Sequence, residues 1–327
     1  MSNVVFYKNL YNLKKALKYF EIESFRNCTT PIKLHMGELF NNNINHNLIK
    51  LLVEILKERD VNPYLFDTTV RYPTLRFFKI GYKLIAYMNG FSIDKIGCKI
   101  KIDNSGYPIN INNQIIEVAK DIVKSNQFIV ISHITGHNIT GISGALKNLG
   151  MGCVTTKTKK KIHNGGRPIY NVDSCTLCGI CVDSCPIDAI KLKNNKWKFD
   201  KLFCSGCGIC IDSCPTNALT FEEANFHYNL ILAAKASIQK KNIIYINDLN
   251  NITQYCDCAS NPGKIFMPNI GYLVSDDPVA IDKASLDLIE NIQENIFQKI
   301  HNVDATIQLK KAEKNKLGKL NYDLVKL

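Results

Sequence analysis

Eight of the thirteen cysteines form two copies of one pattern, Cys-x2-Cys-x2-Cys-x3-Cys-Pro. The first copy is Cys175, Cys178, Cys181 and Cys185, and the second is Cys204, Cys207, Cys210 and Cys214. This spacing is typical of a pair of [4Fe–4S] clusters, in which the fourth cysteine of each copy ligates the other cluster. The sequence therefore predicts one cluster on Cys175, Cys178, Cys181 and Cys214, and a second on Cys204, Cys207, Cys210 and Cys185.

Structural zinc and disulfides are the alternatives for this segment. Two zinc ions would use eight thiolates, but zinc gives no reason for a third cysteine at the same spacing or for the repeated Cys-Pro. Disulfides are disfavoured because the N-terminus does not read as a signal peptide and an odd number of thiols would leave one unpaired.

A second set of polar residues follows the expected strands of an open sheet, where ligands bind beyond the carboxyl ends. His35 and Glu38 follow residues 32–34, and Asp67 follows 64–66. We expect these residues to converge on one pole with a further group: His133, His137, Cys256, Asp257, Cys258 and Asp276.

The richest stretch, residues 132–148, is a glycine-rich loop between an expected strand and a helix. Such a loop presents free N–H groups to an anion, so Gly141, Ser143 and Gly144 are candidate cofactor-binding residues. Lys147 adds a positive charge, and His133, His137 and Lys147 are the candidate catalytic residues. The glycines have an equally plain alternative, since they also permit turns and close packing.

Imidazole and thiolate together suit zinc, nickel or iron. Cys256 and Cys258 are therefore a possible second metal site with His133 and His137, completed by Cys153 or His163. The alternative is that these are buried hydrophobic cysteines and hydrogen-bonded histidines.

Hydrophobic periodicity outside the cysteine block alternates helices with short strands. Helices are predicted over 46–58, after Pro73 to Gly90 with Phe77, Ile80, Leu84 and Met88 on one face, over 114–124, over 226–241 and after Pro278. Strands are predicted at 64–66, 128–131, 243–246 and 271–275. This alternation predicts an α/β fold with a mostly parallel sheet and helices on both faces.

The cysteine block interrupts this pattern, so residues 171–222 are predicted to be an inserted, small α+β ferredoxin-like two-cluster domain. The α/β domain then comprises residues 1–170 and 223–300, and residues 301–327 are expected to form a loosely packed polar tail.

The net charge of +12 invites a nucleic-acid interpretation, which we discount because 36 of the 41 basic residues are lysines rather than arginines. The run Lys157, Lys159, Lys160 and Lys161 is expected to be a solvated loop. Lysines 191, 193, 196, 198 and 201 lie between the cluster motifs and could attract an acidic redox partner. No apolar run is long enough to cross a bilayer, and the expected location is cytoplasmic.

Residues 33–38, 132–153, Asp257-Cys258 and 275–282 resemble the family catalogued as domain of unknown function 362, in the form with a two-cluster ferredoxin insert. The resemblance implies an uncharacterised redox protein with an α/β domain and [4Fe–4S] clusters. Residues 141–147 are similar to a stretch of the nickel-pincer lactate racemase family. That similarity implies that Lys147 carries a cofactor and that His133 and His137 act as acid and base.

The sequence thus predicts an iron–sulfur redox protein that transfers electrons through two clusters. The alternative is a ferredoxin-coupled oxidoreductase, or an enzyme that uses an additional metal or an anionic organic cofactor on a small-molecule substrate at the strand ends of the α/β domain.

Overall fold

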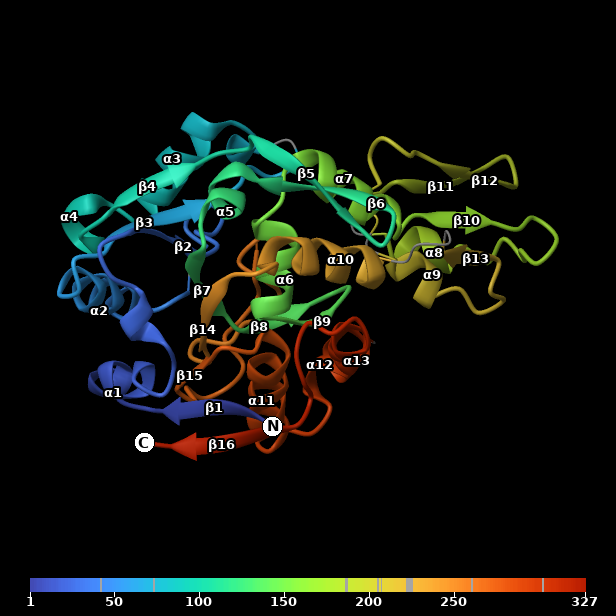
Figure 1. Ribbon diagram of the computed structural model, residues 1–327. Coiled ribbons are helices and arrows are strands. Elements are labelled where there is room, and N and C mark those ends of the chain that lie inside the picture. The colour runs from blue at the N-terminus through green and yellow to red at the C-terminus, as the bar shows by residue number, and fades with distance from the viewer. Residues whose placement is uncertain are drawn as a thin grey trace.

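The computed structural model of the protein describes residues 1–41, 43–72, 74–185, 188–204, 206, 208–221, 226–259, 261–301 and 303–327. Eight strands form its main sheet: β1 (Ser2–Tyr7), β2 (Thr29–Lys33), β3 (Asn62–Asp67), β4 (Lys99–Ile102), β7 (Gln127–His133), β14 (Asn242–Asp248), β15 (Tyr272–Ser275) and β16 (Tyr322–Lys326). Their order is β16-β1-β15-β14-β7-β2-β3-β4 (Figure 1). All neighbouring strands are parallel except β15, which is antiparallel to β1 and β14. The predicted mostly parallel α/β sheet is confirmed.

Hydrophobic cores lie on both faces of the sheet. In β7, Phe128 and Val130 face one core, and Ile129 and Ile131 face the other. Burial on both faces explains why this strand reads as a continuous apolar run. One face is covered by α1 (Leu13–Leu17), α2 (His46–Lys57), α3 (Lys79–Met88) and α4 (Ile93–Ile96). The other is covered by α5 (Lys120–Lys124), α6 (Ala145–Gly152), α7 (Thr156–Asn164), α10 (Phe226–Ile238), α11 (Pro278–Glu290), α12 (Ile296–His301) and α13 (Thr306–Lys314).

The helix predicted over 114–124 is wrong for its first half. Residues 114–119 form β6 (Gln114–Ala119), which pairs with β5 (Gly106–Ile111), and only α5 is helical. Asn112 and Asn113 join the strands with φ of 49° and 58°, the left-handed conformation that favours a tight hairpin. Ile116 and Val118 are buried while Ile115 is exposed, so the residues alternate as a strand requires.

The helix predicted after Pro73 is present as α3, but its apolar stripe faces outward. Ile80 is 84% exposed and Leu84 is 52% exposed, whereas Tyr82 and Ile85 are buried. The Tyr82 hydroxyl donates a hydrogen bond to Asp67 at the end of β3. This tertiary contact, rather than hydrophobic periodicity, fixes which face of α3 meets the sheet.

The C-terminal residues are not a loose tail. Leu309 and Ala312 of α13 are fully buried, and β16 pairs in parallel with β1 along its length. Figure 1 shows the first and last strands side by side at one edge of the sheet. Lysine- and asparagine-rich composition concealed this packing, because only a few apolar residues in the segment face the core.

The cysteine-rich residues form a small unit at one end of the molecule (Figure 1). Its elements are β10 (Pro168–Tyr170), α8 (Ile180–Asp183), β11 (Ile190–Lys193), β12 (Lys196–Phe199), α9 (Ile209–Asp212) and β13 (Leu219–Phe221). β10 pairs with β13 and β11 with β12, both antiparallel. The remaining elements are β8 (Thr135–His137), β9 (Gly141–Ser143), η1 (Leu10–Asn12), η2 (Ile22–Ser24) and η3 (Leu75–Phe77). Among the described residues, no helix is long and apolar enough to cross a membrane.

Candidate functional site

A cavity of about 150 Å³ opens at the carboxyl ends of the parallel strands. Its walls include most of the residues predicted to converge there: His35, Asp67, His133, His137, Ser143, Gly144, Lys147, Cys256, Asp257 and Cys258. Glu38 and Asp276 are the exceptions. Glu38 is hydrogen-bonded to Arg76 and does not line the cavity. Asp276 follows β15, whose antiparallel direction pairs Ser275 with Tyr245 and so carries Asp276 away from this pole. We call the cavity and its lining the strand-end pocket.

His133 ends β7 and is held from both sides. Its Nδ1 lies 2.8 Å from Asp257 Oδ2, and its Nε2 lies 2.8 Å from the carbonyl oxygen of Asn250. Burial alone would lower the pKa of His133, but the Asp257 carboxylate and these hydrogen bonds raise it to about 9. Both ring nitrogens then carry protons at neutral pH, so His133 acts as a fixed cation and offers no lone pair to a metal.

Lys147 reaches the pocket from the first turn of α6. Its Nζ lies 3.1 Å from Cys256 Sγ, 3.8 Å from Cys258 Sγ and 3.4 Å from Ser143 Oγ. Burial lowers the pKa of Lys147 to about 7, with a smaller contribution from Arg76 and opposition from Asp257. At neutral pH this amine can therefore both give and take a proton.

Cys256 and Cys258 form a disulfide beside this lysine. Together with His137 they also form a group whose potential ligand atoms all lie within 4.8 Å of one another. The His137 Nδ1 accepts hydrogen bonds from the backbone N–H groups of Ile139 and Thr140, both at 3.2 Å. Nδ1 is thus the unprotonated nitrogen, and the proton of the neutral ring is on Nε2.

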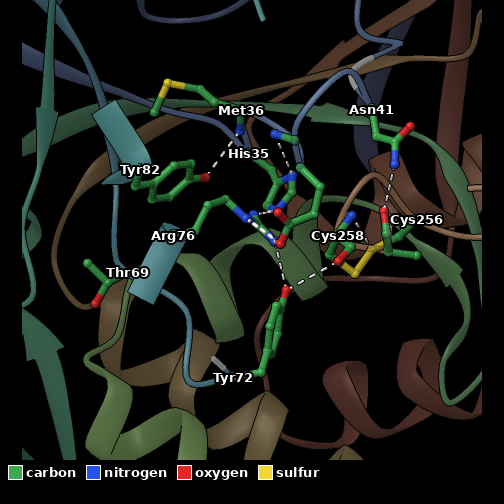
Figure 2. A network of polar contacts seen from close by, with 12 residues as sticks. His35, Met36, Asn41, Thr69, Tyr72, Arg76, Tyr82, Cys256 and Cys258 are labelled. Carbon is green, nitrogen blue, oxygen red and sulfur yellow. Dashed lines mark hydrogen bonds and ion pairs between the residues drawn. A yellow bond between two sulfur atoms is a disulfide. The ribbon is translucent and has the colours of Figure 1, made fainter. Parts of the chain in front are cut away.

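Behind the lining residues His35 and Tyr72 lies Arg76, which is fully buried. Its Nε donates to Glu38 Oε1 at 2.7 Å, and its Nη2 donates to Tyr72 Oη at 2.7 Å. Arg76 Nη1 lies 2.6 Å from His35 Nε2, so the guanidinium joins His35, Glu38 and Tyr72 into one network (Figure 2). The Tyr72 hydroxyl in turn donates to the carbonyl oxygen of Cys258 at 3.3 Å.

The basic run at 157–161 is not a solvated loop. It lies on α7, and Lys159 is buried with its Nζ 2.7 Å from Thr68 Oγ1 and 2.6 Å from the carbonyl oxygen of Thr69. Burial lowers the pKa of Lys159 to about 7, with Asp67 opposing the shift. Lys33 also lines the pocket and pairs with Asp67 at 3.0 Å.

The glycine-rich loop already holds an anion from the protein itself. The N–H groups of Ala145 and Leu146 donate to the two Asp282 carboxylate oxygens at 2.7 and 2.9 Å. A Cβ on Gly144 would lie 2.3 Å from Asp282 Oδ1, so this glycine permits the close approach. Ser143 and Gly144 still line the pocket, but these two N–H groups at the start of α6 are occupied by Asp282.

Four cysteines of the small unit surround a second cavity: Cys175, Cys178, Cys181 and Cys214. Trp197, Tyr170 and Leu192 also line it. In the other predicted set, burial raises the pKa of the Cys204 thiol and the nearby Cys185 adds to this shift. Cys210 is buried in the unit's core. Cys207 lies outside the described residues.

The small unit contacts the strand-end pocket directly. Arg71, which lines the pocket, donates from Nη2 to the carbonyl oxygen of Cys204 at 3.2 Å. Gly206, with φ of 68°, packs so tightly that a Cβ there would lie 1.8 Å from the carbonyl oxygen of His163, another pocket residue. The second cysteine copy therefore sits against the wall of the pocket.

Sequence reasoning missed Arg71, Tyr72, Arg76 and Lys159. Arginine is rare in this chain, and two of its five arginines lie within six residues of each other at 71–76. That local concentration was the available signal. Cys153, by contrast, is buried in the core away from the metal group, and burial raises the pKa of its thiol to about 12.

No curated protein matches the chain. Among solved structures it resembles the lactate racemase apoprotein from Thermoanaerobacterium thermosaccharolyticum, with a TM-score of 0.45, 13% identity and 90% of this chain covered. It also resembles a protein from Thermotoga maritima, with a TM-score of 0.45, 13% identity and 86% covered. The chain spans 57% and 59% of the lengths of these two proteins. A family model described as a domain of unknown function (DUF362) matches residues 31–287, and the chain therefore belongs to the DUF362 family.

Proposed function

We propose that this protein is an electron carrier that holds two [4Fe–4S] clusters in residues 171–222. The observation that carries the proposal is the grouping of Cys214 with Cys175, Cys178 and Cys181 around one cavity. Cys214 belongs to the other copy of the motif, and this exchange of the fourth cysteine is characteristic of two-cluster ferredoxins. A zinc site on neighbouring Cys-x2-Cys pairs would not require the exchange.

The residues fit the chemistry of the clusters. Thiolates are the ligands that iron–sulfur clusters use, and backbone N–H groups near the sulfurs tune the reduction potential. Such N–H groups are present: Leu177 donates to Cys175 Sγ at 3.4 Å, Ala189 to Cys185 Sγ at 3.3 Å and Gly206 to Cys204 Sγ at 3.3 Å. When bound, the clusters would accept and release one electron at a time.

The surface of the small unit suits an acidic redox partner. Lys191, Lys193, Lys196 and Lys198 all point outward from the β11–β12 hairpin, and Lys201 follows it, also exposed. A group of like charges steers an oppositely charged protein toward the surface and loses this effect as salt rises. The rate of electron exchange with an acidic ferredoxin should therefore fall with ionic strength.

Anaerobic purification with iron, sulfide and metal analysis, followed by EPR before and after dithionite, tests the proposal. We expect about eight irons and eight sulfides per chain and two interacting reduced clusters. Cys178→Ser should lose or convert one cluster, while Cys28→Ser, outside the motif, should retain both. Zinc without sulfide, or a full cluster complement in Cys178→Ser, would contradict the proposal.

A second candidate function is an enzyme whose reaction takes place in the strand-end pocket. It is favoured by the charge of the lining, since among the described residues no carboxylate forms an ion pair with Arg71, Lys147 or Lys159. The surplus of cations suits an anionic organic substrate or cofactor. The same metal analysis, with mass spectrometry of released small molecules, tests this candidate. A bound anion or a non-cluster metal in stoichiometric amount would support it.

A further inference from the structure

Cys256 and Cys258 have surroundings that differ from those of the other cysteines outside the cluster motifs. Cys28, Cys98 and Cys153 are free thiols, and burial raises the pKa of Cys98 and Cys153. Cys256 and Cys258 are joined, border the strand-end pocket and both accept contacts from the Lys147 amine. We propose that Cys256 and Cys258 are a redox-active pair that interconverts between disulfide and dithiol, and so stores two electrons beside the pocket.

Lys147 is the residue that makes this pair reactive. A cation near a cysteine favours the thiolate, which is the form that attacks and leaves in thiol–disulfide exchange. At 3.1 Å from Cys256 Sγ, the Lys147 ammonium stabilises the thiolate of the buried partner. The backbone N–H of Cys258 also donates to Cys256 Sγ at 3.2 Å. Both cysteines line the pocket, and Cys258 is the less buried of the two.

The state of His137 favours the redox pair over a metal site. A Cys-Cys-His metal site needs an unprotonated ring nitrogen aimed at the ion. In His137 the unprotonated Nδ1 already accepts from Ile139 and Thr140, which leaves Nε2 with the proton. The sulfurs are moreover bonded to each other and not separated around an ion.

The pair also lies close to a predicted source of electrons, the second cluster. This part of the inference rests on the proposed function. Arg71 and Tyr72 are consecutive residues. Arg71 donates to the carbonyl oxygen of Cys204 at 3.2 Å. Tyr72 donates to the carbonyl oxygen of Cys258 at 3.3 Å (Figure 2). A dipeptide thus joins the loop of a predicted cluster ligand to the loop of the disulfide.

Reduction of the pair breaks the Sγ–Sγ bond and takes up two electrons and one proton. The electrons arrive singly from a low-potential iron–sulfur donor, which is oxidised by one electron each time. Water entering the pocket supplies the proton that converts Cys258 to a thiol. Cys256 is released as a thiolate, which the Lys147 ammonium 3.1 Å away stabilises.

A single tryptic peptide isolates this pair from all other cysteines. Cleavage after Lys241 and Lys264 releases residues 242–264, which contain Cys256 and Cys258 and no further cysteine. The intact protein is equilibrated anaerobically in dithiothreitol or glutathione redox buffers, and its free thiols are then labelled with iodoacetamide. After digestion, mass spectrometry measures the number of labels on this peptide. We expect the peptide to carry either no label or two labels, with one two-electron midpoint.

Two variants of Lys147 test the role of the amine. Lys147→Met removes the cation that stabilises the reduced form, so the equilibrium should shift about tenfold toward the disulfide, which is about 30 mV for a two-electron couple. Lys147→Arg keeps a cation at this position, so its midpoint should lie close to that of wild type. Cys28→Ser should leave the midpoint unchanged. A midpoint that is the same in wild type and Lys147→Met would contradict the assigned role.

Reduction by methyl viologen distinguishes a failure of the redox pair from a failure of the proposed clusters. Reduced methyl viologen should open the disulfide in wild type and do so at least tenfold more slowly in Cys210→Ser, whereas dithiothreitol should act equally on both. If no clusters exist but the peptide still titrates, the redox pair stands and its electron source is external. Three results would refute the redox pair in a protein that holds its clusters. The peptide could carry two thiols at every potential, its disulfide could resist dithiothreitol in the folded protein, or each reduced chain could retain one zinc ion.

Discussion

At the scale of single residues, the strand-end pocket is unusual in how it holds its basic groups. Lys33 in the pocket and Arg76 behind it are buried in ion pairs with Asp67 and Glu38. The buried Lys159 and the half-buried Lys147 instead make hydrogen bonds to neutral partners. Removal from water disfavours the ammonium form and outweighs the charges of Asp257 and Asp67, so the pKa of each lysine falls to about 7. Both amines are thus set to exchange protons near neutral pH.

The lowered pKa of Lys159 predicts a specific dependence of stability on pH. From about pH 7 to 10.5 the unfolded chain holds a proton on this amine that the folded protein has released. The free energy of unfolding should therefore rise with pH across this window, by at most about 1.4 kcal/mol per pH unit from this group. Urea unfolding of wild type and Lys159→Met between pH 7.5 and 10 measures the difference in slope.

Lys157→Met is the matched control, because Lys157 lies on the same helix with its side chain 81% exposed. Its slope should equal that of wild type. An equal slope in Lys159→Met would mean that Lys159 remains charged inside the folded protein.

At the scale of elements, the apolar stripe predicted for α3 is not the face that the structure buries. Its regular apolar stripe is on the surface, and the face that meets the sheet contains Tyr82, Ile85 and Ala86. The Tyr82 hydroxyl and the Asp67 carboxylate bring a polar contact into this interface. The pattern therefore identified a helix but chose the wrong side.

Substitutions on the two faces of α3 should change the free energy of unfolding by very different amounts. Ile80→Lys and Leu84→Lys, at exposed positions, should change the free energy of unfolding by no more than about 0.5 kcal/mol. Ile85→Ala, at a position 2% exposed, should cost about 2–5 kcal/mol because it leaves a cavity. Thermal unfolding of the three variants tests this, and a large loss in Ile80→Lys would show that the stripe is covered in solution.

At the scale of the whole molecule, the two termini close one edge of the sheet. β16 pairs with β1 from Ser2↔Tyr322 to Phe6↔Lys326, and Asp277 accepts from both Ser2 Oγ and the N–H of Lys319. The same carboxylate caps α11 through the N–H groups of Val279 and Ala280. The beginning, the end and a core helix of the chain are thus joined at Asp277.

Removal of residues 319–327 should expose the edge of β1 and lower the melting temperature. Unpaired strand edges also promote association, so we expect more aggregation on heating. Light scattering during thermal unfolding measures both effects. Asp323→Ala, which alters an exposed side chain and keeps the backbone pairing, should behave as wild type; a truncated chain that melts like wild type would refute the closing role of β16.

The sequence by itself determined the alternation of strands and helices, the mostly parallel sheet and most residues of the strand-end pocket. These follow from local properties: apolar runs, caps such as Asp277 and the rule that parallel strands end at one pole. The cysteine spacing carried the prediction of two clusters in the same way, since ligands close in sequence need no knowledge of the rest of the fold.

Only the tertiary structure decided the contacts between distant segments. The antiparallel direction of β15 moved Asp276 off the pocket, and the packing of α11 placed Asp282 on the N–H groups expected to bind a cofactor. The disulfide beside Lys147 depends on a loop more than a hundred residues away from that lysine. Such pairings are set by the packing energy of the whole domain, and no local pattern in the sequence records them.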